Sequence, residues 1–265
     1  MEDLKYTIGK APDRRKKKMK AAILTSSLGG AEKIDGKHFP AKLLEDNGEL
    51  EMVRSFWTDN ARVLFITASP DDQERNDGTI YCMSQAFSMS GLSVSEVLMC
   101  DRRTEELVNE ISKMDVLILT GGHVPTENAF FQELKLREKL SGFSGLLIGW
   151  SAGSMNCADM VYAGPELPGE AVDPNYQRWI PGLGITKTNI FPHLQDLRDE
   201  MIDGMRMVED VTFSDSMGHE ILALNDGSYL LVEETGETVF GEAYRILDGK
   251  MERICENGGS VRWRP

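Results

Sequence analysis

A serine lies between two glycines in the segment Gly149-Trp150-Ser151-Ala152-Gly153. The apolar run over residues 145–148 predicts a buried strand, and the residues after the serine predict the start of a helix. A tight strand-to-helix turn needs small side chains and unusual backbone angles, which Gly149 and Gly153 can supply. It would bring Ser151 to the carboxyl edge of a sheet, beside helix amides that stabilise an oxyanion. The segment indicates nucleophilic catalysis, although a glycine-rich turn without chemistry shows the same pattern.

A serine hydroxyl is a weak nucleophile, so it needs a general base and an acid that orients the base. The chain has four histidines. His193 ends a short apolar run and is expected at a strand end, where Ser151 should also emerge. His123 follows a glycine pair and suits substrate contact better than proton transfer. His219 would be the base only in the order serine, acid, late histidine that α/β-hydrolases use.

The acid is harder to choose from the residues alone. If His193 is the base, the acid can come from the later turn Asn225-Asp226-Gly227. Asp226 is also an ordinary residue of a hairpin turn, and that role alone would explain it. The two arrangements, one with His193 and one with His219, therefore both stay open at this point.

The elements expected around these residues alternate between strands and helices. Strands are predicted over 21–25, 62–68, 93–99, 115–120 and 144–148, and helices over 73–90, 104–112 and 128–140. This alternation predicts an α/β fold with a mostly parallel sheet and helices on both faces. The loops 121–123 and 150–152 should meet at the carboxyl edge of that sheet, where such folds place their sites.

Other segments are predicted with less regular structure. Residues 26–50 and 162–184 are expected to be loops, while helices are expected to continue over 155–160 and to run over 197–207. Two hairpins are predicted near the C-terminus, one across Asn225-Asp226-Gly227 and one across Asp248-Gly249. The C-terminal part should therefore be antiparallel.

Composition limits the class of protein. The chain has 265 residues with 43 acidic and 29 basic side chains, which gives a formal net charge of −14. This charge opposes binding to nucleic acid and to anionic membranes. Four widely spaced cysteines indicate neither a zinc site nor a disulfide framework. We expect a cytoplasmic enzyme without metal or cofactor, acting on a small substrate, with a homodimer left open.

Two parts are predicted along the chain. Residues 1–20 include the basic run Arg14-Arg15-Lys16-Lys17-Lys18 and are expected to be a flexible, solvated extension rather than a nucleic-acid-binding or membrane-binding arm. Residues 21–265 are expected to form a single α/β domain.

The motifs resemble those of one family. Gly121-Gly122, Gly149-Trp150-Ser151-Ala152-Gly153 and Pro192-His193, in this order, are similar to motifs of peptidase E and the cyanophycinases. These serine peptidases share the flavodoxin-like fold of the class I glutamine amidotransferases, which carry cysteine at the elbow. The resemblance implies a serine peptidase that cleaves small peptides, with a dipeptidase as one form of it.

The resemblance also implies roles for residues. Ser151 would be the nucleophile and His193 the base, and the amides of Gly122 and Ala152 would form the oxyanion hole. Asp226 is the favoured acid, with Glu166 as the alternative.

The segment after His193 is more acidic than in relatives that cleave after aspartate, so their specificity is not transferred. We name His123, Asn128 and Arg198 as candidate substrate contacts. An esterase, amidase or acyltransferase that uses the same serine, and a non-catalytic binding protein, remain alternative functions.

Overall fold

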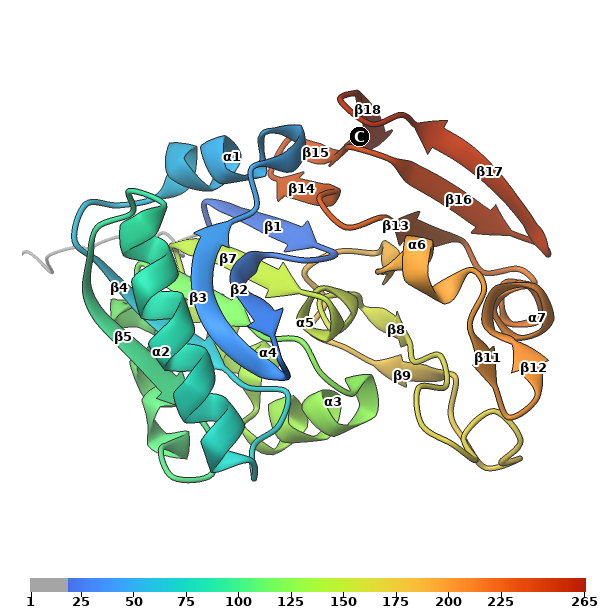
Figure 1. Cartoon of the computed structure of the whole chain (residues 1–265), viewed down its shortest axis with the longest axis horizontal. Helices are drawn as coiled ribbons and strands as arrows, with labels where there is room; N and C mark the ends of the chain where they lie inside the picture. Colours follow the sequence, from blue (N-terminus) through green and yellow to red (C-terminus); the bar gives the residue numbers. More distant parts are fainter. Residues whose placement is uncertain (1–18) are drawn as a thin grey trace, which may run out of the picture.

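The computed structural model describes residues 19–265, so most of the extension predicted for residues 1–20 lies outside the described residues. An eight-stranded sheet runs through the protein in the order β18-β15-β14-β1-β7-β6-β4-β5 (Figure 1). Its five parallel strands are β1 (Ala21–Thr25), β4 (Ala61–Ile66), β5 (Val94–Cys100), β6 (Val116–Leu119) and β7 (Leu146–Trp150). All five strands that the alternation predicted are present.

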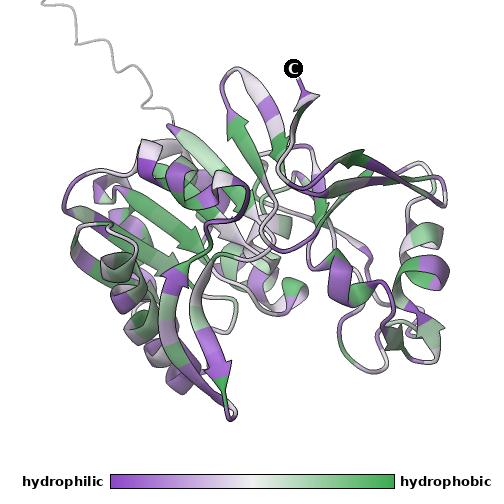
Figure 2. Cartoon of the chain, turned by 45° about the horizontal axis from the view of Figure 1, so that its top comes forward, coloured by the Kyte–Doolittle hydropathy of each residue, from purple (hydrophilic) through white to green (hydrophobic). Residues whose placement is uncertain are grey.

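The central strands are apolar on both faces because helices cover both faces (Figure 2). On one face, Phe65 of β4 packs with Phe87 of α2 (Gln73–Met89) and with residues of α1 (Glu49–Phe56). On the other face, Leu117 of β6 packs with Phe130 of α3 (Val124–Glu133). The 3₁₀ helix η2 (Glu105–Lys113), the short α4 (Leu136–Lys139) and the 3₁₀ turn η3 (Leu140–Gly142) complete this second layer.

Antiparallel strands extend and flank the parallel core. The large sheet continues through β14 (Tyr229–Glu233), β15 (Gly236–Phe240) and β18 (Ser260–Arg264). A second sheet has the order β10-β13-β16-β17 and consists of β10 (Asn189–Phe191), β13 (Ile221–Leu224), β16 (Ala243–Leu247) and β17 (Lys250–Cys255). The predicted hairpin across Asp248-Gly249 is confirmed as β16 and β17.

The predicted hairpin across Asn225-Asp226-Gly227 is wrong. β13 pairs with β10 and β16, whereas β14 pairs with β1 and β15, so the turn carries the chain from one sheet to the other. The same turn residues suit either connection, and only the pairing partners decide between them. The consequence is that Asp226 lies between the two sheets.

The other incorrect predictions concern short elements. Residues 26–50 form the hairpin β2 (Gly29–Ile34) and β3 (Lys37–Leu43), then η1 (Asp46–Gly48) and α1. The hairpin turns at Asp35 and Gly36, which both have positive φ, as such two-residue turns require. Its strands are largely exposed, so they lack the apolar run that marks a buried strand.

Two further helix predictions are wrong: one helix is much shorter than predicted, and the other is replaced by different elements. The helix after the serine is the single turn α5 (Ala152–Met155), followed by β8 (Met160–Tyr162), which pairs with β9 (Trp179–Pro181) inside the predicted long loop. The helix expected over 197–207 is replaced by α6 (Leu194–Leu197), β11 (Met201–Ile202) and β12 (Met205–Arg206), because Asp203 and Gly204 form a turn at positive φ. The π-helical turn η4 (Met207–Thr212) and α7 (Phe213–Asp215) follow. Among residues 19–265, no helix combines the length and apolar character needed to cross a bilayer.

The turn between β7 and α5 depends on close approach of backbones. A Cβ atom on Gly153 would lie 2.7 Å from the Cβ of Leu119 in β6, and one on Gly149 would lie 2.8 Å from the Cα of Ser154. Packing therefore requires small side chains at both positions, as predicted, but the unusual backbone angle falls on Ser151, with φ 53°, and not on the two glycines.

We predict that Gly153→Ala lowers the free energy of unfolding by about 1–3 kcal/mol because the new methyl group overpacks against β6. Gly78→Ala is the matched control, since a Cβ at Gly78 in α2 would meet no described atom within 4 Å apart from its chain neighbours and the backbone of its own helix. It should leave stability unchanged or raise it by about 0.5–1 kcal/mol through helix propensity. Urea unfolding measures both, and equal effects would contradict the packing argument.

Candidate active site

The backbone of Ser151 is held in a conformation that is rare for a residue with a side chain. Its φ is 53° and its ψ is −113°, directly after β7. The Ser151 amide donates to Thr25 O of β1 at 3.0 Å, and the Ser151 carbonyl accepts from Ser154 N at 2.9 Å. Strained angles of this kind cluster at functional sites, because the surrounding structure has to enforce them. Here they aim the hydroxyl at the carboxyl edge of the sheet.

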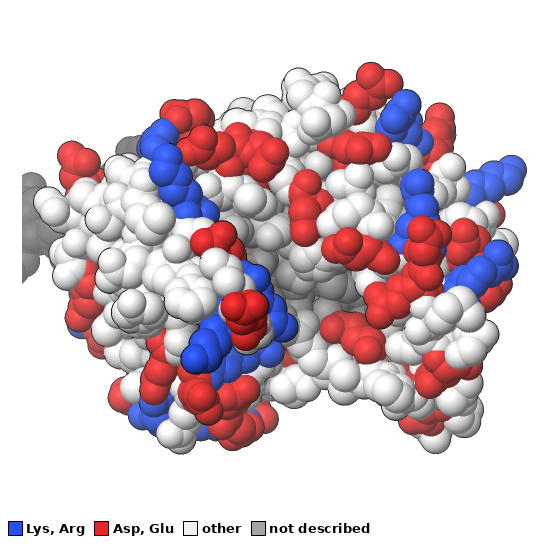
Figure 3. Space-filling view, in the orientation of Figure 1, with Lys and Arg blue, Asp and Glu red and all other residues white. Residues whose placement is uncertain are grey.

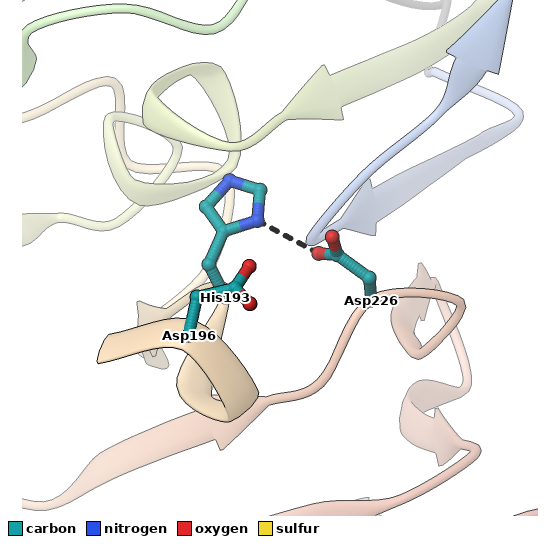
Figure 4. A group of neighbouring side chains, drawn as sticks. All are labelled: His193, Asp196 and Asp226. Atoms are coloured by element: carbon teal, nitrogen blue, oxygen red, sulfur yellow. Dashed lines mark hydrogen bonds and ion pairs between the residues drawn. The ribbon is translucent and has the colours of Figure 1, made fainter. Parts of the chain in front are cut away.

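The structure brings His193 to Ser151, the pairing that the family resemblance implied and that the residues alone had left open beside His219. His193 follows β10 with φ 57°, and its Nε2 lies 2.9 Å from Ser151 Oγ. Its Nδ1 lies 2.7 Å from Asp226 Oδ1 (Figure 4). The imidazole thus connects the hydroxyl and the carboxylate within hydrogen-bond distance on both sides.

Asp226 is fixed by further hydrogen bonds. Ser26 Oγ donates to Asp226 Oδ1 at 2.7 Å and accepts from His193 N at 2.8 Å, so one hydroxyl holds both the acid and the base. The Asp226 amide donates to Gln195 Oε1 at 2.9 Å. Partial burial raises the pKa of Asp226, but the hydrogen bonds from His193 and Ser26 outweigh it and lower the pKa below its ordinary value.

The charge on Asp226 decides the roles of the two ring nitrogens. A carboxylate can only accept at His193 Nδ1, so Nδ1 carries the proton in the neutral ring. Nε2 is then unprotonated and accepts the Ser151 hydroxyl proton. This arrangement can activate a serine for attack on a carbonyl.

Asp196 lies near the same histidine. Ligand atoms of His193, Asp196 and Asp226 lie within 4.8 Å of one another, a spacing that could hold a metal ion (Figure 4). Both ring nitrogens of His193 are already engaged, however, by Ser151 and Asp226. We therefore assign these three residues no metal.

Two backbone amides next to Ser151 can receive an oxyanion. Gly122 and Ala152 line the same cavity as Ser151. Within residues 19–265, neither N–H has a hydrogen-bond acceptor. Since α5 has only four residues, stabilisation has to come from these amides rather than from a long helix dipole.

Arg75 of α2 fixes the peptide that carries one of these amides. Arg75 Nη2 donates to Gly121 O at 2.9 Å. In a planar trans peptide the carbonyl and the following N–H point in opposite directions, so this bond turns the Gly122 N–H away from Arg75. The guanidinium thereby sets the direction of the proposed oxyanion donor.

Ser151 lies between two cavities. The larger holds about 500 Å³ and reaches from Gly122 and Ser151 to Glu166, Phe191 and Met207. The smaller, of about 400 Å³, has a polar lining that includes Arg75, Asn76 and Thr120. Both open on Ser151 and His193, so a substrate bound across the serine can occupy the two together.

Glu166, the alternative acid, lies on the wall of the larger cavity. Its Oε1 accepts from Val124 N at 3.1 Å, and it makes no hydrogen bond to His193. Glu166 lines this cavity, and desolvation of its carboxyl raises the pKa of the group. Asp226, not Glu166, occupies the position behind the imidazole.

The candidate substrate contacts are placed differently from our expectation. His123 bonds Thr126 Oγ1 through Nδ1 and Glu170 Oε1 through Nε2, so it ties the loop before β9 to α3. Asn128 is buried and donates to Pro181 O and to Asn156 Oδ1. Neither side chain lines a cavity beside Ser151. We therefore interpret the hydrogen bonds of His123 and Asn128 as structural, and not these residues as substrate contacts.

Arg198 is also removed from the candidate contacts. Its guanidinium carbon lies 5.2 Å from the centre of the Tyr244 ring, and the residue lines neither cavity. Since Arg198 is not a lining residue, no arginine from residues 19–265 lines the larger cavity, which affects the choice of substrate.

Sequence reasoning missed Ser26, Gln195 and Arg75. Ser26 could have been found, because it directly follows the buried central strand β1 and so had to lie at the carboxyl edge. Gln195 and Arg75 carry no comparable signal, since each is a polar residue on an otherwise ordinary helix.

Comparisons with known proteins agree with this geometry. The model of peptidase family S51 matches residues 44–240, more than half of the chain. The chain belongs to peptidase family S51. It is accordingly a serine peptidase, and the expected likeness to peptidase E is confirmed.

Solved structures show the same fold. A peptidase from an acI-B1 Actinobacterium superposes with a TM-score of 0.62 at 16% identity, covering 94% of this chain and 98% of its own. A protein named as a candidate peptidase E from Listeria monocytogenes EGD-e superposes with a TM-score of 0.54 at 15% identity, covering 89% of this chain and 99% of its own. No curated protein matches the sequence. The predicted α/β fold class is confirmed.

We predict that Arg75→Ala lowers kcat for peptide hydrolysis about 10- to 100-fold with little change in KM, because the Gly122 amide loses its alignment. Arg75→Lys should restore part of kcat, since an ammonium can also donate to Gly121 O. Arg253→Ala, which removes an exposed arginine of β17, is the control. A purely structural role would instead lower the melting temperature and leave kcat of the folded fraction unchanged.

Proposed function

We propose that the protein hydrolyses small peptides through an acyl-enzyme on Ser151, with His193 as general base and Asp226 as the orienting acid. The observation that carries this proposal is the pair of hydrogen bonds through one imidazole, 2.9 Å to Ser151 Oγ and 2.7 Å to Asp226 Oδ1. A structural serine would not need a histidine held between it and a carboxylate.

The first half of the reaction forms the acyl-enzyme. His193 Nε2 takes the hydroxyl proton as Ser151 Oγ attacks the peptide carbonyl, and Asp226 stabilises the imidazolium that results. The carbonyl oxygen becomes an oxyanion that the amides of Gly122 and Ala152 bind. The imidazolium then protonates the leaving amine, and the C–N bond breaks.

The second half releases the acyl group. Water enters where the amine left, and His193 takes a proton from it as it attacks the ester carbonyl. The oxyanion forms at the same two amides and collapses, and Ser151 recovers its proton from the imidazolium. The free acid leaves, and the site returns to its starting state.

The proposal also covers the size of the substrate, the cellular compartment and the partners of the protein. A cavity of about 500 Å³ accommodates a few residues rather than a folded chain, which supports a small peptide. The four cysteines are buried and free, which supports a reducing compartment such as the cytoplasm. The net charge of −14 argues against nucleic acid as a partner. A homodimer and a single domain over 21–265 stay predictions from the sequence.

We predict that Ser151→Ala lowers kcat/KM for peptide hydrolysis by at least about 10³-fold, because no other group can form the acyl-enzyme. Ser88→Ala, which removes an exposed hydroxyl of α2, should leave the rate unchanged. Hydrolysis of a dipeptide library, read by mass spectrometry, measures both variants. Equal turnover by wild type and Ser151→Ala would reject the proposal, and turnover of esters alone would favour an esterase.

A further inference from the structure

The two cavities beside Ser151 differ in charge. The larger is lined by three carboxylates, Glu166, Glu200 and Asp203, and by no lysine or arginine within residues 19–265. The smaller is lined by Arg75 and by no carboxylate from the same part of the chain. Figure 3 shows acidic side chains gathered along the right-hand side of the central hollow, over the part of the fold that contributes the larger cavity.

The walls of the larger cavity are otherwise apolar. The side chains of Val124, Met155, Phe191, Ile202 and Met207 line it, and all five residues are buried. Such walls favour a substrate group with several methylene units, because burying each one contributes about 0.8 kcal/mol.

The three carboxylates differ in how many hydrogen bonds they accept from the protein. Asp203 accepts from Gly169 N at 2.8 Å and from Ala171 N at 3.0 Å, so it holds the loop that forms one wall. Glu166 lines the cavity and uses one carboxylate oxygen, Oε1, to accept from Val124 N. Glu200 is exposed at the cavity lining and has no hydrogen-bond or ion-pair partner for its carboxylate within residues 19–265.

Binding of an acidic substrate side chain in this cavity would be unfavourable. Such a side chain would bring a further negative charge among three carboxylates and lose water without gaining a cation. A neutral apolar side chain would pack on the apolar walls but leave the carboxylates without a cationic partner. A side chain with an apolar stem and a cationic end would use both features, as lysine and arginine do when their stems pack on apolar surface.

We propose that the larger cavity binds the side chain of the residue whose carbonyl Ser151 attacks, and that it selects lysine or arginine there, with Glu166 and Glu200 as specificity-determining residues. This inference rests on the proposed function and names the substrate class of that site. The charge of the smaller cavity supports the orientation, because Arg75 would repel a cation from the other side of the serine.

The test uses covalent labelling of Ser151, so it does not depend on finding the natural peptide. Three diphenyl aminoalkylphosphonates share a leaving group and differ only in the side chain, which is that of lysine, norleucine or aspartate. Lysine and norleucine have stems of four carbons, and only lysine adds the charge. We expect the lysine analogue to label the full-length protein at least about tenfold faster than norleucine, and aspartate to label it slowest.

Variants of the two glutamates identify the source of this preference. Glu166→Gln keeps an oxygen for Val124 N and removes the charge, and Glu200→Gln removes the charge at the lining. Each should lower the ratio of lysine to norleucine rates several-fold. Glu138→Gln, on the exposed surface of α4, removes the same charge outside the cavity and should keep the ratio.

The outcomes separate the inference from the proposed function. An uncharged alkyl fluorophosphonate tests whether Ser151 is reactive at all. If it labels Ser151 but the norleucine analogue equals the lysine analogue, or the aspartate analogue is fastest, the inference is overturned and the proposed function stands. If neither the fluorophosphonate nor any analogue labels Ser151, the proposed function fails and the inference fails with it.

Discussion

The hydrogen bond between Asp226 and His193 is the interaction on which the rest of this site depends. Asp226 lies on the crossover between the two sheets, His193 follows a strand of the second sheet, and Ser151 follows a strand of the first. The bond therefore joins the two sheets at the point where the serine emerges. Ser26, at the end of β1, strengthens this junction because its hydroxyl contacts both the carboxylate and the histidine backbone.

The parallel core and the serine were predictable because both leave strong local signals. A strand that is buried on two faces is a continuous apolar run, and a tight elbow requires glycines at fixed positions around Ser151. The presence of only four histidines limited the search for a base, and the family resemblance then favoured His193 over His219. The position of His193 at a strand end followed from the apolar residues before it.

The choice of acid and the second half of the fold were much less predictable. The turn Asn225-Asp226-Gly227 suits a hairpin as well as a crossover, and only pairing over more than 200 residues, β14 with β1, decides between them. The segment 197–207 has apolar spacing that fits a helix, yet it forms two very short strands around Asp203. These elements take their conformation from tertiary contacts, which no local pattern contains.

The same short elements set the chemistry of the substrate cavity. Glu166 comes from the loop after β8, and Glu200 and Asp203 come from the segment between α6 and β12. Loops of this kind can change without changing the sheet that carries them, so the charges around Ser151 do not follow from the fold. The fold is shared with these solved structures, whereas the preference for a substrate has to be argued from the side chains of this chain.

The most direct measurement for the central claim is the rate at which an alkyl fluorophosphonate labels Ser151 in wild type, His193→Ala and Asp226→Asn. If the imidazole activates the hydroxyl and the carboxylate orients the imidazole, wild type should label fastest and both variants at least about 10²-fold more slowly. Equal labelling rates in all three folded proteins would show that Ser151 does not depend on this hydrogen-bonded pair, and would contradict the account.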